Sequence, residues 1–117
     1  IGIGPFVVGP AVERKVGTSA FSAMTINSTK WFDASWAREK GLYTEVFETT
    51  EEMDIEISKL ASTLSISNPK AMDGLKKIMW EGTNHWDTLL MERAESSGKL
   101  VLSDFTKNAI EKLKSYL

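Results

Sequence analysis

Apolar residues recur at the spacing of an α-helix along much of this chain. From residue 53 to residue 64 they stand at i, i+4, i+7, i+8 and i+11, which places them on one face of a helix. They are Met53, Ile57, Leu60, Ala61 and Leu64. Just before them, Thr49 and Glu52 have the spacing of a capping box, in which each side chain accepts a hydrogen bond from the other residue's backbone amide. The pattern predicts an amphipathic helix that begins after Thr49.

Start and stop signals of the same kind mark further helical segments. Proline suits the first turn of a helix, Ser, Thr, Asp and Asn cap its amino end, and glycine provides a left-handed exit. In the first half of the chain, one segment is expected from Pro10 to Gly17. A second is capped by Thr18 or Ser19 and has Phe21, Met24 and Ile26 inward. A third covers residues 34–40, between the cap Asp33 and the exit Gly41. In the second half, one helix is expected from Asn68-Pro69 to Gly82, with Met72, Leu75, Ile78 and Met79 inward. The next has Trp86, Leu89, Leu90 and Ala94 on its inner face and ends near Gly98. The last is capped by Ser103 or Asp104 and has Phe105, Ala109, Leu113 and Leu117 inward.

One segment lacks the helical pattern. Residues 42–47 are partly β-branched or aromatic, which predicts an extended segment and at most one strand. The rest is a string of amphipathic helices without repeats or low-complexity tracts. The sequence therefore predicts a mainly α fold with at most one or two short strands. Such a pattern does not by itself indicate a function.

Composition removes several classes of function. Sixteen acidic and fourteen basic residues give a net charge of −2 without long runs of one sign, so the basic patch of a nucleic-acid-binding protein is missing. No apolar run approaches the roughly 20 residues that span a bilayer. The absence of cysteine and the single His85 exclude thiolate catalysis and multi-histidine or thiolate metal sites, and fit a cytoplasmic protein. Because the chain opens on Ile1 rather than methionine, we expect processing or truncation.

Several short patterns, in order along the chain, resemble the second half of one enzyme family. They are Ile1-Gly2-Ile3-Gly4-Pro5, Arg14-Lys15-Val16-Gly17, residues 28–42, the Pro-x-Ala-x-x-x-x-Lys spacing of Pro69, Ala71 and Lys76, and Asp104 followed by Ala109-Ile110-Glu111-Lys112. Residues 28–42 are similar to the element Thr-Gly-Arg-x-Ile-x-Ala-x-Glu-Ala-x-x-x-Gly-Leu, with Trp36 at the place of its usual acid. By these patterns the chain resembles the carboxy-terminal part of the crotonase, or enoyl-CoA hydratase/isomerase, family.

The resemblance implies the helical, carboxy-terminal portion of a crotonase-like α/β fold. Residues 1–48 would be the end of the crotonase core, and residues 49–117 would be a helical oligomerisation region of the kind that forms trimers or dimers of trimers in the family. The implied reaction adds water across the double bond of a 2-enoyl-CoA thioester in fatty-acid or related acyl-CoA metabolism. Coenzyme A would be part of the substrate, with no separate cofactor. Enoyl-CoA isomerisation and other reactions of the family stay alternatives.

The same resemblance places the catalytic groups before Ile1. Enzymes of this family stabilise the thioester oxygen with two backbone N–H groups and use two glutamates as general base and acid. The second glutamate is expected about three residues before Ile1. We therefore expect no catalytic residue within the chain, and an inactive isolated chain. The internal acids Glu13, Glu51, Glu52, Glu92 and Glu95 are interpreted as surface, capping or ion-paired charges.

Two sets of residues are predicted to contact the acyl-CoA. Pro5, Phe6, Val7 and Val8 belong to the loop that closes over the acyl chain in the family, and Lys112 matches a lysine that helps to hold the nucleotide end of CoA. Both sets have an alternative. Residues 6–8 would instead pack the interior or form a subunit contact, and Lys112 would be one more solvent-exposed lysine on a lysine-rich helix.

The remaining large or titratable side chains have structural interpretations. His85, at the start of a helix, is interpreted as a capping or packing residue. The four tryptophans belong either to a core or to a subunit interface; they are Trp31, Trp36, Trp80 and Trp86.

Three functions follow from these observations. The leading interpretation is the carboxy-terminal part of an enoyl-CoA hydratase-like lyase. The alternatives are a non-catalytic oligomerisation module and a small acyl-CoA-binding protein. For any of them we expect the chain to self-associate, with two- or threefold symmetry.

Overall fold

The computed structural model describes residues 1–115, and the expected inward position of Leu117 lies outside them. Within this range the chain forms helices and no strand, so the mainly α prediction is confirmed. The helices are α1 (Gly9–Ile26), α2 (Ala34–Glu39), α3 (Thr50–Ser65), α4 (Pro69–Met79), α5 (Trp86–Val101) and α6 (Asp104–Lys114). No helix in residues 1–115 has both the length and the apolar character needed to cross a membrane.

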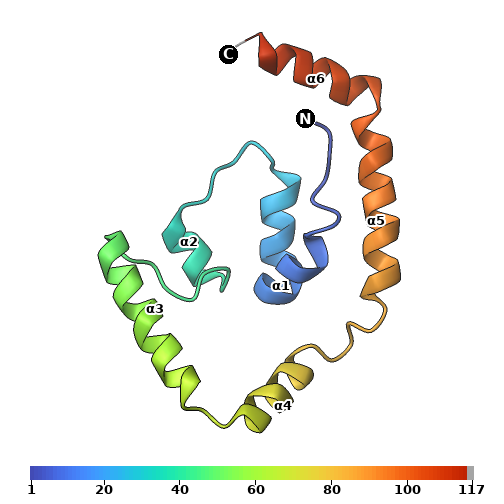
Figure 1. Ribbon diagram of the computed structural model, residues 1–117. Helices are drawn as coiled ribbons and strands as arrows, with labels where there is room; N and C mark the ends of the chain where they lie inside the picture. The colour runs from blue at the N-terminus through green and yellow to red at the C-terminus, as the bar shows by residue number, and fades with distance from the viewer. Residues whose placement is uncertain (116–117) are drawn as a thin grey trace.

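The helices are arranged as an open arc. Figure 1 shows α3, α4, α5 and α6 following one another around the outside, with α1 and α2 on the inner side of the arc. The amino-terminal segment runs between α1 and α5 and reaches the start of α6. Among residues 1–115, α5 and α6 are the only two helices whose backbones come close, at the corner where α6 follows α5 (Figure 1).

Local capping signals fix where the helices begin. The Asp33 carboxylate accepts a hydrogen bond from the Trp36 amide at 2.7 Å, at the start of α2. Thr49 and Glu52 form the expected capping box on α3. The remaining two side-chain caps are Asn68 on α4 and Ser103 on α6. The caps of α2 and α3 were predicted from the sequence, and so was the start of α4 from Pro69; for α6 the prediction was Ser103 or Asp104, and Ser103 is the cap. Each depends only on residues within the same turn.

Glycine sets the direction of the chain at the predicted breaks. Gly17 has φ 78° and ψ 159°, and divides α1 into the two segments that the sequence indicates. Gly41 and Gly82 also have positive φ, 78° and 80°, directly after α2 and shortly after α4. A residue with a Cβ is strained in this region of φ, so these positions suit glycine.

One prediction about local structure is wrong. The helix expected to end near Gly98 continues to Val101, because Gly98 is helical and the chain turns at Leu102 and Ser103 instead. Residues 42–47 form bends and irregular backbone without a strand, which the prediction of at most one strand allows.

The apolar faces do not close into a core. Only Gly9, Pro10, Ala20, Ala37 and Thr106 are buried among residues 1–115. The expected inward positions are mostly open: every residue of α3 is exposed, Ile26 is 86% exposed and Phe105 is 71% exposed. Periodicity predicts which residues share a face, but within residues 1–115 most of these faces stay exposed.

The overall dimensions agree with this open arrangement. The chain has a radius of gyration of 18.7 Å, against about 13 Å for a compact domain of this length. It exposes 9502 Å², whereas a compact monomer of 13.0 kDa exposes about 6,300 Å². About 3,200 Å² of surface is therefore uncovered in excess of a compact fold.

Two arginines provide the long-range side-chain hydrogen bonds of the described chain. From α1, the Arg14 guanidinium donates to the Met79 carbonyl at 2.5 and 3.2 Å and to the Glu81 carbonyl at 3.0 Å. Carbonyls at the end of a helix have no partner within the helix, so Arg14 supplies one for α4. From α5, Arg93 donates to the Phe6 carbonyl at 3.3 Å. These contacts hold α4 and the amino-terminal segment in place.

We expect Arg14→Ala to release the end of α4 from α1. Amide exchange at the end of α4 and in residues 80–83 should become about fivefold faster, because an exposed hydrogen bond contributes on the order of 1 kcal/mol. Arg14→Lys should not restore protection, since lysine lacks the planar fork of donors. Arg38→Ala serves as the control, because it removes the same side chain from α2. Equal exchange in all variants would contradict a tether at Arg14.

Candidate functional site

The predicted acyl-binding loop, residues 5–8, forms the turn that leads into α1. The Phe6 amide donates to the Gly4 carbonyl at 2.8 Å, and the Phe6 ring folds back over Gly4. A Cβ at Gly4 would lie 2.5 Å from that ring, so a larger residue at this position would displace the Phe6 ring. Val8 occupies the amino-cap position of α1, and Pro10 lies in the first turn as predicted.

The apolar side chains of this loop are only partly covered. Phe6 is 37% exposed, Val7 44% and Val8 53%. Packing within the described chain therefore leaves these three side chains partly uncovered. Their contact with an acyl chain or with a neighbouring subunit stays a prediction.

Arg93 supports the loop from α5. Its guanidinium reaches the Phe6 carbonyl, and a Cβ at Gly9 would lie 3.3 Å from Arg93 Nη1 and 3.1 Å from the Phe21 ring. The glycine at position 9 leaves room for this approach. In the sequence Arg93 stands between two glutamates and gives the signal of a surface charge, so its contact with a residue 87 positions away was missed.

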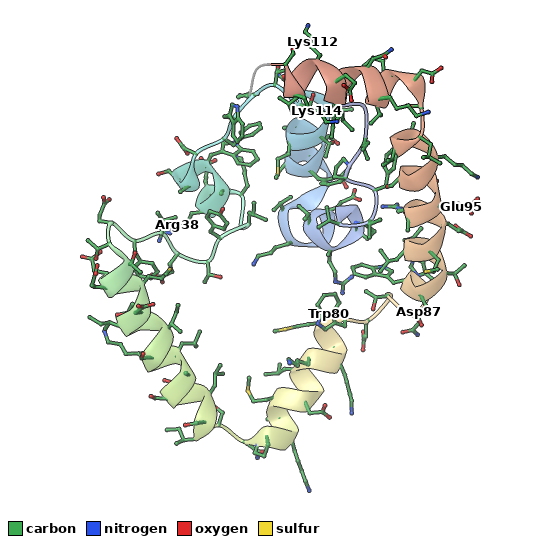
Figure 2. All side chains as sticks on the ribbon, turned by 45° about the horizontal axis from the view of Figure 1, so that its top comes forward. Arg38, Trp80, Asp87, Glu95, Lys112 and Lys114 are labelled. Atoms are coloured by element: carbon green, nitrogen blue, oxygen red, sulfur yellow. The ribbon has the colours of Figure 1, made fainter. Side chains whose placement is uncertain are left out.

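Lys112 lies in the last turn of α6, away from the loop. Its side chain is exposed and projects outward from the arc (Figure 2). No hydrogen bond or ion pair of the Lys112 ammonium occurs within residues 1–115. The described chain thus does not bring Lys112 and residues 5–8 into one pocket. Contact of Lys112 with a phosphate of CoA stays a prediction.

A separate hollow of about 680 Å³ lies between residues 42–47 and α3. Its apolar lining includes Leu42, Phe47, Ile57 and Leu60, and Lys15 of α1 closes one side. None of the residues predicted to contact acyl-CoA lines it. Ile57 and Leu60, which line the hollow, belong to the exposed apolar face of α3.

The internal acids behave as ordinary surface charges. Glu13 accepts a hydrogen bond from the Thr18 hydroxyl at 2.8 Å, Glu52 belongs to the capping box, and Glu95 pairs with Lys99 at 2.6 Å. Residues 1–115 hold no group of three or more His, Asp and Glu side chains placed to bind a metal ion.

The aromatic residues pair locally rather than forming a core. Trp80 and Trp86 meet edge to face, with ring centroids 5.7 Å apart, across the connection between α4 and α5. Trp36 stacks on Phe32 at 4.1 Å, whereas Trp31 is 96% exposed. His85 occupies the amino-cap position of α5 but its side chain makes no capping hydrogen bond, so of the two predicted roles, capping and packing, only packing is left as a prediction.

Comparison with known proteins assigns no family to this chain. No family model, no curated protein and no solved structure matches it.

Lys112→Ala tests the predicted contact with CoA. If the complete protein acts on an acyl-CoA, we expect its Michaelis constant to rise about fivefold with turnover less affected, because an exposed ion pair contributes on the order of 1 kcal/mol equally in ground and transition states. Lys107→Ala removes the same charge from the same helix, where Lys107 lies near Asp104 at 3.9 Å, and should leave the kinetics unchanged. Identical kinetics for both variants would make Lys112 an ordinary solvent-exposed lysine.

Proposed function

We propose that this chain is the carboxy-terminal part of an acyl-CoA enzyme of the enoyl-CoA hydratase type. The observation that carries the proposal is the ordered set of crotonase-like patterns, which extends from Ile1 to Lys112. The patterns fall on structural boundaries: residues 28–42 contain the cap and glycine exit of α2, Pro69 begins α4, and Asp104 begins α6.

The proposed chemistry divides between two parts of the protein. The oxyanion hole and both glutamates would lie before Ile1, where they add water to the unsaturated thioester and move the α-carbon proton. This chain would contribute the loop of residues 5–8 beside the acyl group and Lys112 beside the nucleotide. Isomerisation of the double bond would use the same binding residues, so the reaction depends on the upstream acids.

The decisive experiment compares two lengths of the protein. The coding sequence before Ile1 is determined, and the complete protein and the 117-residue chain are assayed for hydration of crotonyl-CoA. We expect turnover in the complete protein only, and an acid about three residues before Ile1 whose replacement by glutamine lowers turnover about 10²- to 10⁴-fold. Turnover by the 117-residue chain alone, or the absence of that acid, would overturn the proposal.

A non-catalytic oligomerisation module is the second candidate. It is favoured by the surface that the chain leaves uncovered, about 3,200 Å² beyond that of a compact monomer. Stable permanent interfaces bury about 2,000–5,000 Å² in total, so this excess is of the size that assembly requires. A complete protein that assembles but acts on no acyl-CoA would support this candidate.

A further inference from the structure

The inner face of α5 carries a single charged side chain. The half-buried residues of this helix recur at helical spacing and are Trp86, Leu89, Leu90, Arg93, Ser97 and Leu100. The other charged side chains of α5 are exposed, and Glu95 among them projects from the outer side of the arc (Figure 2). Removing a guanidinium from water among largely apolar neighbours is costly unless its N–H groups find acceptors. The contact that Arg93 makes is therefore worth following.

That contact is with the predicted acyl-binding loop. Arg93 Nη1 donates to the Phe6 carbonyl at 3.3 Å. The Phe6 amide is held as well, since it donates to the Gly4 carbonyl at 2.8 Å. With partners for both of its backbone polar groups, Phe6 has a fixed backbone direction, and so does the side chain of Val7 that follows it.

The other end of the same segment is fixed on α6. Gly2 has φ 82°, and a Cβ there would lie 2.5 Å from the Phe105 ring and 3.3 Å from the Thr106 hydroxyl. Thr106 is fully buried in a helix that is otherwise mostly exposed. Figure 1 shows the segment running beside α5 to the start of α6. One end of the segment thus rests on α6, and Arg93 holds the end that leads into α1.

We propose that Arg93 is a positioning residue that sets the acyl-chain selectivity of this site, because it holds Phe6, Val7 and Val8 in place as a wall for the acyl group. The inference rests on the proposed function, which takes residues 5–8 as the loop beside the acyl chain. A long acyl chain buries more apolar surface against such a wall than a short one, so its binding depends more on where the wall lies. Arg93 acts through the Phe6 carbonyl and needs no contact with the substrate.

The test compares crotonyl-CoA with the longer trans-2-decenoyl-CoA in the complete protein. In Arg93→Ala we expect the Michaelis constant for decenoyl-CoA to rise about fivefold relative to that for crotonyl-CoA, with both turnover numbers little changed, since only the binding wall is displaced. Arg93→Lys should restore most of the selectivity, because one ammonium N–H is enough for a single hydrogen bond to a carbonyl. As the control, Lys99→Ala removes an exposed cation of the same helix, paired with Glu95 at 2.6 Å, and should leave both Michaelis constants unchanged.

Amide exchange in the 117-residue chain measures the same contact without the reaction. Arg93→Ala should make exchange in residues 6–8 about fivefold faster, whereas Lys99→Ala should not change it. Unchanged exchange, equal changes in the two Michaelis constants, a larger loss for crotonyl-CoA, or no recovery in Arg93→Lys would each overturn the role of Arg93. A wild-type complete protein that turns over neither thioester would instead overturn the proposed function, and the selectivity role would fall with it.

Discussion

The arrangement of this chain depends on hydrogen bonds from two arginines to backbone carbonyls distant in sequence. Arg14 joins α1 to the end of α4, and Arg93 joins α5 to the loop before α1. In an ordinary domain such contacts supplement a buried apolar core, which supplies most of the driving force. Here the buried residues are small, so the guanidinium contacts are what join the end of α4 to α1 and α5 to the loop before α1.

The sequence predicted what local interactions determine. The caps at Asp33 and Thr49, the helix start at Pro69 and the break at Gly17 each involve residues within one or two helical turns, and all were expected from the sequence. For α6 the sequence left Ser103 and Asp104 open, and Ser103 is the cap. The end of α5 was misplaced, because glycine in a helix lowers stability without forcing an end. The contacts of Arg14 and Arg93 gave no signal, since a backbone carbonyl 65 or more residues away has no distinctive sequence.

In the candidate site, too, the sequence predicted the local structure but not the distant contacts. The turn at residues 4–8 follows from local glycine and proline chemistry, and the structure places it beside α5. Its relation to Lys112 would depend on subunits or segments that complete the binding surface. An apolar face can be assigned from periodicity, but periodicity does not tell which molecule covers it.

The near absence of helix-to-helix packing has a consequence for the way the chain melts. Cooperative unfolding requires that the loss of one element removes contacts from others, and here only α5 and α6 share a helix interface in the described residues. Each helix is then stabilised mainly by its own caps and turns, and isolated helices of this length are marginal in water. Heating the lone chain should give a gradual loss of helicity, and a sharp transition would emerge only when association links the helices into one thermodynamic unit.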